Sequence, residues 1–310
     1  NQSHLNKIDI TIVVNATNPW TARDYDNGLC NGSESMVVEF SRELAKHGNV
    51  NVYCSCDGKR YTDITESGDI VNYYDRKYLH INKMHGTLIA FKDAEALYLE
   101  DFDQRFLWSA DPEKLNAVQR QLCDGMFALG PWHEQELKSL NIGYRPISYI
   151  EPGIPYETSD VKRVPKQCLY ASSPDRGLGF LEGIWPEVLK AHPDATLVRT
   201  YSKYKRRSNQ EMVDLYHQSD ILAYPCLGAE RYCITAIKAQ MYGTTPCVIP
   251  NMALQDTVQF GKKCLKKDYL KTIIEVLDNK DREDERRKMM SEVKFNRWED
   301  VITIWRQIIG

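Results

Sequence analysis

Short apolar runs alternate with amphipathic helical patterns along almost the whole chain. In the first half, apolar runs rich in β-branched and aromatic residues predict strands, and apolar residues recurring every three or four positions predict helices. Val37, Phe40 and Leu44, for example, share one face of a helical stretch. The expected strands are 8–15, 50–54, 87–91, 96–100, 105–109, 125–130 and 147–150, and the expected helices are 32–48, 112–124 and one that begins at Pro131.

The second half repeats this alternation. Strands are expected at 167–172, 195–201, 220–225 and 244–250, and helices at 176–192, at 209–219, from near Glu230 and at 296–309. The helix at 176–192 should bury Leu181, Ile184, Trp185 and Val188, and the last helix Val301, Ile302, Trp305 and Ile309. The charged stretch 278–290 predicts a helix face in contact with solvent.

Alternating strands and helices are typical of parallel sheets with right-handed crossovers. The 310 residues suffice for two domains of about 150 residues each. We therefore predict an α/β protein with two Rossmann-like domains, 1–155 and 156–310, whose parallel sheets face an inter-domain cleft.

The charge, hydropathy and cysteine content of the chain limit the classes of protein to which it could belong. The net charge of −3 gives no electrostatic reason to expect nucleic acid as the partner. No apolar run reaches the ~18 residues that span a bilayer. The start Asn1-Gln2-Ser3-His4 is neither a signal peptide nor an initiator methionine, which suggests a trimmed chain or a module of a longer polypeptide. The nine scattered cysteines contain no C-x-x-C pair, so we expect buried free thiols and a cytoplasmic location.

Two loops that follow predicted strands could bind an anion. The first, "DNGLCNGSES", has Gly28 and Gly32, which permit close backbone approach, and Ser33, which can cap the next helix. The free N–H groups of such a helix end suit a phosphate. A plain glycine turn with a capping serine is the alternative interpretation. The G-x-G-x-x-G dinucleotide fingerprint is absent, which argues against a nicotinamide or flavin enzyme.

The second loop lies in "YASSPDRGLGFLEG". Ser172 and Ser173 leave the strand, Asp175 can cap, and Arg176-Gly177 begins the helix, so a diphosphate would meet an arginine and a helix N-terminus together. The alternative is that Arg176 is only a surface cation. The basic run after the next strand (Lys203, Lys205, Arg206 and Arg207) is more often a solvated loop.

These loops belong to four segments that together resemble a known family. "NGSESMVVEFSRELAKHGNVNVY", "YASSPDRGLGFLEGIWPEVLKAHPDATL", "YHQSDILAYP" and "AERYCITAIKAQMYGTTPCVI" are similar, in order and spacing, to the retaining, family-four glycosyltransferases of GT-B fold. The resemblance spans nearly the whole chain. It implies an acceptor-side N-terminal domain, a nucleotide-sugar-binding C-terminal domain and a last helix that crosses back to the N-terminal domain.

The resemblance also implies roles for individual residues. Glu230 and Asp111 would be catalytic, Glu230 beside the donor sugar and Asp111 on the acceptor side. The donor diphosphate would be bound by Arg176, Gly177, Ser173, Gly32 and Ser33. Lys238 and Ile234 would lie at the ribose, and Glu34, Arg231, Tyr232 and Cys233 at the donor sugar or acceptor.

Two positions depart from the family's pattern. Lys238 stands where the Glu-x7-Glu motif has its second glutamate, and a lysine cannot accept hydrogen bonds from ribose hydroxyls. Losing such a contact costs ~1.5–3 kcal/mol, or roughly 10–100-fold in donor affinity. Lys238 could instead pair with Glu230 or reach a phosphate. Ala110 precedes Asp111 where family members often have a histidine.

Other chemistries find weaker support. "DFD" at 101–103 matches the metal-binding D-x-D of the other major glycosyltransferase fold, but three-letter motifs are common by chance. His133 is the one histidine that we place near a cleft. No G-x-S-x-G elbow occurs, which argues against an α/β-hydrolase.

We therefore predict a hexosyl- or pentosyltransferase that moves a sugar from a UDP- or GDP-sugar to a glycan, glycoconjugate or other hydroxyl acceptor, with retention and with no metal or other cofactor. The main alternative is a catalytically impaired nucleotide-sugar-binding module, suggested by Lys238 and Ala110. A GT-B-shaped epimerase or phosphorylase and a non-sugar Rossmann enzyme are the remaining alternatives.

Overall fold

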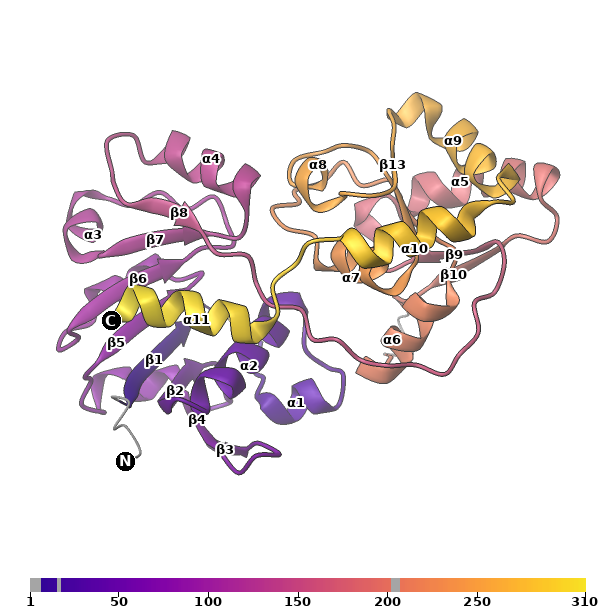
Figure 1. Cartoon of the computed structure of the whole chain (residues 1–310). Coiled ribbons are helices and arrows are strands. Elements are labelled where there is room, and N and C mark those ends of the chain that lie inside the picture. Colours follow the sequence, from indigo (N-terminus) through magenta and orange to yellow (C-terminus); the bar gives the residue numbers. More distant parts are fainter. Residues whose placement is uncertain (1–6, 16–17, 202–206) are drawn as a thin grey trace. The chain divides into compact units, whose positions relative to one another are not determined.

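The chain folds into two compact units. The computed structural model describes residues 7–15, 18–201 and 207–310 (Figure 1). Unit 1 comprises Asn1–Pro155 together with Asn296–Gly310, and unit 2 comprises Tyr156–Phe295. The C-terminal residues therefore belong to the same unit as the N-terminal half of the chain.

Unit 1 is built on an eight-stranded sheet with the order β3-β4-β2-β1-β5-β6-β7-β8. All neighbouring strands are parallel except β3 and β4. The strands are β1 (Ile8–Val14), β2 (Gly48–Cys54), β3 (Arg60–Ile64), β4 (Ile70–Asp75), β5 (Thr87–Phe91), β6 (Gln104–Trp108), β7 (Gly125–Ala128) and β8 (Ile147–Tyr149). Ligands of parallel sheets bind beyond the carboxyl ends of the strands, so the loops after these strands are the positions to examine.

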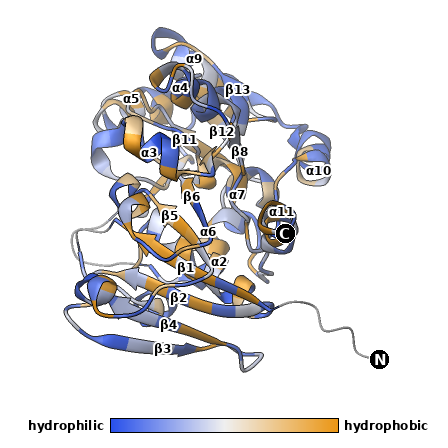
Figure 2. Ribbon diagram, turned by 90° about the vertical axis from the view of Figure 1, so that its left-hand side faces the viewer, coloured by the Kyte–Doolittle hydropathy of each residue, from blue (hydrophilic) through white to orange (hydrophobic). Residues whose placement is uncertain are grey.

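The central strands are apolar because both faces of the sheet are covered. Every residue of β5 is buried, and β1 is buried from Ile10 onward. Figure 2 shows β1 and β5 in hydrophobic colours and the outer strand β3 largely in hydrophilic ones. The β3–β4 hairpin was not among the predicted strands, because an edge strand exposed on one side carries polar residues that resemble a loop.

The helices of unit 1 lie between and after these strands. They are α1 (Ala22–Asp26), α2 (Gly32–Ala45), α3 (Ala117–Leu122), α4 (Pro131–Leu140) and α11 (Trp298–Ile309), with 3₁₀ helices η1 (Arg76–His80) and η2 (Ala94–Tyr98). Pro131 occupies the first turn of α4, as expected, where its missing N–H costs nothing.

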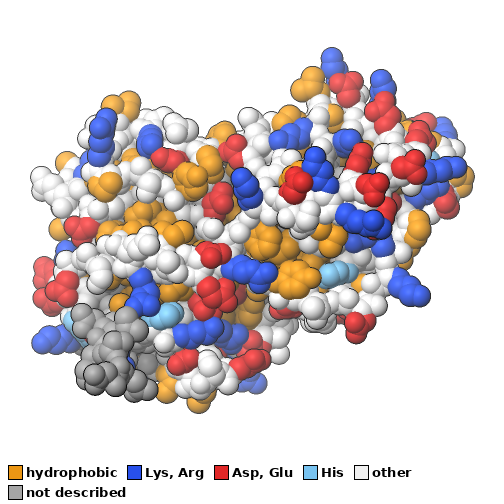
Figure 3. All heavy atoms as spheres, viewed as in Figure 1, with side chains coloured by type: hydrophobic (Ala, Val, Ile, Leu, Met, Phe, Trp, Pro, Cys, Tyr) orange, Lys and Arg blue, Asp and Glu red, His pale blue; other side chains and the backbone are white. Residues whose placement is uncertain are grey.

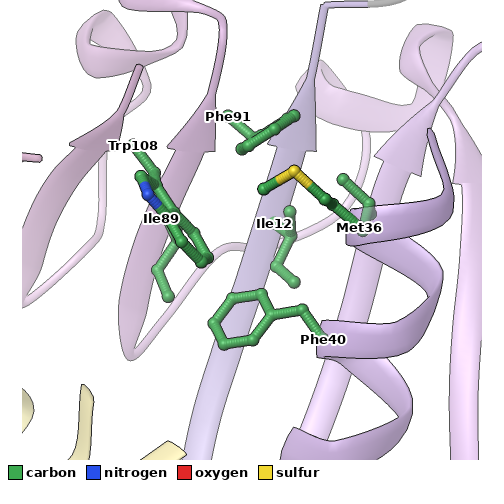
Figure 4. Close-up of a pocket in the computed structure, with 7 residues that line it drawn as sticks. Ile12, Met36, Phe40, Ile89, Phe91 and Trp108 are labelled. Carbon is green, nitrogen blue, oxygen red and sulfur yellow. The ribbon is translucent and has the colours of Figure 1, made fainter. Parts of the chain in front are cut away.

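The last helix, α11, packs into the core of unit 1. Its Trp305 is fully buried, with ring centroids 5.1 Å from Phe127 and 5.7 Å from Trp108. Beneath α2, a small gap is lined by Ile12, Met36, Val37, Phe40, Ile89, Phe91 and Trp108 (Figure 4). The gap has no space for a water molecule, so these side chains form hydrophobic core rather than a ligand site.

Unit 2 contains a five-stranded, wholly parallel sheet with the order β10-β9-β11-β12-β13. Its strands are β9 (Gln167–Tyr170), β10 (Thr196–Arg199), β11 (Ile221–Tyr224), β12 (Thr245–Val248) and β13 (Lys262–Lys263). Its helices are η3 (Pro174–Arg176), α5 (Leu178–Ala191), α6 (Asn209–Gln218), α7 (Ile234–Tyr242), α8 (Leu254–Thr257), η4 (Lys266–Asp268), α9 (Tyr269–Asp278) and α10 (Arg282–Glu292).

Several predicted elements differ from the observed ones. The apolar run 96–100 forms the end of η2 and a turn rather than a strand, because η2 and that turn complete the crossover from β5 to β6. The helix predicted at 112–124 is only α3, which begins after the cap Asn116. The helix expected from near Glu230 begins at Ile234, because residues 225–233 form an irregular loop.

The charged stretch 278–290 is not wholly solvated, contrary to the prediction. Arg282 is 6% exposed, and its Nη1 lies 2.5 Å from a carboxylate oxygen of Asp220. Arg286 donates to the same oxygen at 2.7 Å. Burial lowers the pKa of Arg282, and Asp220 opposes that shift. Two cations of α10 are therefore anchored to the loop before β11 rather than to water.

All nine cysteines are free, and seven of them are buried. Within the described ranges, no helix is long and apolar enough to cross a membrane. Figure 3 shows acidic and basic side chains interspersed over the face in view, in keeping with the small net charge.

Candidate functional site

The loops after β9 and β11 of unit 2 meet at Gly177. This residue has φ of +105°, a conformation that favours glycine, and a Cβ there would lie 2.4 Å from the carbonyl oxygen of Pro225. Only glycine therefore allows the two loops to approach so closely. The consequence is that Arg176, the residue before Gly177, is held against the loop that carries Glu230.

Arg176 and Glu230 form an ion pair in this unit. The Arg176 Nη1 lies 3.2 Å from the Glu230 Oε2 and donates to the Ala229 carbonyl at 2.7 Å. The Glu230 side chain is 13% exposed, whereas the Arg176 side chain is 36% exposed. The guanidinium thus retains solvent-accessible surface for a further anion, while the carboxylate is mostly enclosed.

Tyr224 is a second partner of the same carboxylate. Its Oη donates to the Glu230 Oε2 at 2.7 Å, and the Ser172 Oγ donates to the Tyr224 Oη at 3.5 Å. Tyr224 is the last residue of β11 and is buried. The sequence "DILAYP" predicts only a core strand for this tyrosine, because nothing in it indicates which carboxylate the hydroxyl meets.

Burial dominates the electrostatics of Glu230. It raises the pKa of Glu230, and the hydrogen bonds from Tyr224 and Arg176 only partly offset this. The pKa of Tyr224 is also raised, by burial and then by Cys233 and Glu230, so its hydroxyl remains a donor. Burial alone would lower the pKa of Arg176, but its neighbours Tyr224 and Glu230 raise it. The arginine therefore stays cationic.

Other predicted donor-side residues flank this group. Ser173 is the N-cap of η3, and the N-cap of α5 is Gly177 rather than the predicted Asp175. Asp175 is exposed, and a hydrogen bond from Ser173 lowers its pKa. The N-cap Gly177 supplies no side-chain oxygen to the first turn of α5. The backbone of Leu178, in that turn, contacts the Tyr170 hydroxyl.

The residues before and within α7 complete the donor-side set. Tyr232 and Cys233 are buried, Cys233 is the N-cap of α7, and Arg231 is half-buried. Ile234 and Lys238 of α7 are both half-buried. Among the described residues, no ion pair or hydrogen bond engages Lys238, so the suggested pairing with Glu230 is not observed.

In unit 1, the loop after β1 leads into α2, which carries Gly32, Ser33 and Glu34. The N-cap of α2 is Asn31 and not the predicted Ser33. Asn31 and Glu34 form a reciprocal capping box, with both hydrogen bonds at 2.9 Å, so the Glu34 carboxylate is already engaged by backbone. A Cβ on Gly32 would meet none of the described residues within 4 Å, so there is free space beside this glycine.

Asp111 lies in the loop after β6, and His133 holds that loop in place. The Asp111 carboxylate is half-exposed and 3.7 Å from the Lys92 Nζ. His133 is fully buried, accepts from the Leu129 N–H at 3.1 Å and contacts the Asp111 carbonyl at 2.9 Å. His133 therefore positions the loop from the interior, contrary to its predicted place near a cleft.

Glu113, in the same loop, was not predicted from the sequence. Both of its carboxylate oxygens are buried, and neither has a hydrogen-bond partner of good geometry within the described residues. Burial, followed by the nearby Asp111 and Asp93, raises its pKa to about 8, with Ser109 and Lys92 opposing. No local pattern in "SADPEK" distinguishes this glutamate from a surface residue.

Some predicted features lie outside these groups. The described ranges do not include the first four residues of the chain, nor three residues of the basic run, Lys203, Lys205 and Arg206. In the part of the chain that is described, no three His, Cys, Asp or Glu side chains are grouped so as to hold a metal ion, the "DFD" segment included.

The two units define the GT-B glycosyltransferase fold. Sucrose-phosphate synthase from Thermosynechococcus elongatus has 12% identity and a TM-score of 0.63, over 96% of this chain and 98% of that one. Anabaena HepE, solved with UDP and glucose, has 11% identity and a TM-score of 0.60 over the same shares. AviGT4, a glycosyltransferase of avilamycin A biosynthesis, has 10% identity and a TM-score of 0.59, over 97% of this chain and 98% of that one.

No family model matches the chain, and no curated protein matches it in sequence. At identities of 12% or less, the structural likeness establishes the fold alone.

Proposed function

We propose that this protein transfers a sugar from a nucleoside-diphosphate sugar to a hydroxyl group of a glycan or other acceptor. The observation that carries the proposal is the Arg176–Glu230 pair at the carboxyl edge of the unit 2 sheet. A partly exposed cation beside a helix start that has no side-chain cap suits a diphosphate, and an enclosed carboxylate next to it suits sugar hydroxyls. The GT-B fold supports the proposal, and the UDP complexes of HepE favour uridine over guanosine as the base.

On the donor side, Arg176, Ser173 and the backbone at Gly177 bind the diphosphate. Glu230 accepts hydrogen bonds from the donor sugar, with Arg231, Tyr232 and Cys233 shaping its surroundings. Ile234 and Lys238 lie at the ribose, where Lys238 supplies a donor and a positive charge instead of the acceptor that a glutamate would be. On the acceptor side, Gly32, Ser33 and Glu34 border the substrate, and Asp111 accepts a hydrogen bond from a neighbouring hydroxyl of the acceptor, which orients the hydroxyl that attacks.

The proposed reaction breaks the bond between the anomeric carbon and the diphosphate oxygen, whose electron pair leaves with the diphosphate. The acceptor oxygen bonds to the anomeric carbon, and its proton passes to the departing phosphate. Negative charge that builds on the diphosphate is stabilised by Arg176 and by the N–H groups at the start of α5. Attack on the face that the diphosphate leaves gives retention. The proposal assigns the reaction no metal or other cofactor.

Calorimetric titration with UDP and with GDP tests the donor site. We expect the wild type to bind UDP, and Arg176→Ala to weaken that binding by roughly 10–100-fold, because a charge-assisted contact is lost. Arg287→Ala is the matched control, since Arg287 is an exposed arginine of α10 in the same unit. Binding of neither nucleotide by the folded wild type would overturn the proposal.

Product analysis separates transfer from binding alone. Incubation with UDP-sugars and a panel of glycan acceptors, followed by mass spectrometry, should yield UDP and an acceptor heavier by one sugar. An impaired binding module would bind UDP yet release none from any UDP-sugar. NMR of the product's anomeric proton then decides between retention and inversion.

A further inference from the structure

The Glu230 carboxylate is held by two groups of different kinds. Its backbone is fixed, because the Ala253 N–H donates to the Glu230 carbonyl at 2.9 Å. Its side chain receives Tyr224 at 2.7 Å and Arg176 at 3.2 Å, both on Oε2. Leu227, Gly228 and Ala229, which precede it, are exposed, so the loop itself offers the carboxylate little support.

The two partners differ in what else they could bind. Arg176 is half-exposed and is the group proposed for the donor diphosphate, so a bound donor competes with Glu230 for its charge. Tyr224 is buried at 2% exposure, and its ring packs edge-on to Tyr170 with centroids 6.1 Å apart. The Tyr224 ring is therefore held by the core of unit 2, although its hydroxyl also interacts with Arg176.

We propose that Tyr224 is a positioning residue, which keeps the Glu230 carboxylate oriented toward the donor sugar when the diphosphate engages Arg176. This inference rests on the proposed function. It separates two tasks: Arg176 recognises the diphosphate, and Tyr224 preserves sugar recognition through Glu230. The ionisable groups that face Glu230 are Tyr224 from β11, Arg176 from η3 and Cys233 at the start of α7.

The test compares sugar recognition with nucleotide recognition. Dissociation constants are measured for UDP and for two probes, UDP-glucose and UDP-N-acetylglucosamine. The dissociation constant of each probe divided by that of UDP gives a ratio that isolates the contribution of the sugar. Glu230→Ala should change this ratio for at least one probe. With that probe, Tyr224→Phe should change the ratio by about tenfold in the same direction, the value of one hydrogen bond to a charged group. The UDP constant of Tyr224→Phe should stay within about twofold of the wild type.

A double-mutant cycle distinguishes positioning from general structural damage. If Tyr224 acts through Glu230, adding Tyr224→Phe to Glu230→Ala produces no further change in the ratio. Tyr269→Phe is the matched control. It also removes a buried tyrosine hydroxyl, but one that donates to the Cys247 carbonyl at 2.7 Å and not to Glu230. The dissociation constants for UDP and for both probes should therefore stay unchanged.

Each other result overturns the inference. An unchanged ratio in Tyr224→Phe, additive effects in the cycle, or an equal weakening of UDP and both probes would show that Tyr224 does not orient Glu230 for the sugar. If Glu230→Ala leaves both ratios unchanged, Glu230 does not contribute to sugar recognition, and Tyr224 cannot act through it. Failure of the wild type to bind UDP is a different outcome, because it overturns the proposed function itself.

Discussion

The Arg176 guanidinium and the Glu230 carboxylate lie 3.2 Å apart, although 54 positions separate them in the sequence. The cation proposed for the diphosphate is thus paired with the carboxylate proposed for the sugar. A nucleotide that brings only a diphosphate must compete with Glu230 for this arginine. In the proposed function, a complete donor would place its own sugar hydroxyls on Glu230 in return.

This competition predicts that Glu230→Gln binds UDP alone more tightly than the wild type does. Removing the carboxylate frees Arg176 and removes a negative charge near the diphosphate. Partly exposed pairs are worth about 1 kcal/mol or less, so a gain of about two- to fivefold in UDP affinity is expected by calorimetry. Glu182→Gln, which removes an exposed carboxylate 2.6 Å from Arg199, is the control. Equal or weaker UDP binding by Glu230→Gln would argue against competition.

The fold could be predicted from the sequence, because it depends on local patterns. Periodicity locates the buried strands, and parallel sheets place the loops after them at one edge. That reasoning predicts an anion site at Arg176 and Gly177, and the resemblance to GT-B glycosyltransferases adds Glu230. The structure brings Arg176 and Glu230 to 3.2 Å from each other. The sequence does not identify Tyr224, because a tyrosine that ends a strand has the same local pattern whether or not its hydroxyl meets a carboxylate.

The N-cap of α2 was predicted at the wrong residue because several nearby residues could cap the helix. Asn31 and Ser33 both lie near the start of α2 and both can cap, so composition does not choose between them. The choice depends on the backbone entering the helix, which is extended at Asn31. The buried position of Arg282 likewise depends on Asp220, a residue from another segment of the chain.

Lys238→Glu should strengthen nucleotide binding. No described hydrogen bond or ion pair engages Lys238, so its replacement breaks no observed interaction. A glutamate at this position can accept from ribose hydroxyls, which predicts roughly 10–100-fold tighter UDP binding by calorimetry. Lys238→Gln is the matched control, because it removes the charge but offers a weaker acceptor. If Lys238→Glu weakens UDP binding instead, the positive charge of Lys238 contributes to that binding, and its role is phosphate recognition rather than a ribose contact.

The buried carboxyl group of Glu113 should make the stability difference between the wild type and Glu113→Gln depend on pH. Its pKa of about 8 in the folded protein lies above the ordinary value of 4.5, so the folded state holds this proton more tightly than the unfolded state. The contribution of Glu113 to stability is therefore lost as pH rises between these two values, by up to about 1.4 kcal/mol per pH unit. Glu113→Gln mimics the protonated form and has no such loss.

The measurement is urea unfolding of the wild type and of Glu113→Gln between pH 5 and pH 9. The stability of the variant relative to the wild type should rise with pH up to about 8 and then level off. Glu66→Gln, in the exposed turn between β3 and β4, should change stability by less than about 0.5 kcal/mol at every pH. A difference that does not depend on pH would show that Glu113 is ionised in the folded protein.

The burial of Trp305 in the core of unit 1 indicates that α11 is needed for the stability of this unit. Its indole is fully buried among aromatic residues contributed by α2 and by strands β6 and β7. Trp305→Ala should lower the free energy of unfolding by about 3–5 kcal/mol, because the cavity cannot close against a packed sheet. Trp305→Phe should cost less, because it keeps aromatic contacts and removes an indole N–H that has no partner among the described residues. Thr303→Ala, on the exposed face of α11, should stay within about 0.5 kcal/mol of the wild type in urea unfolding. Equal stabilities of Trp305→Ala and Thr303→Ala would contradict the packing of α11 on this sheet.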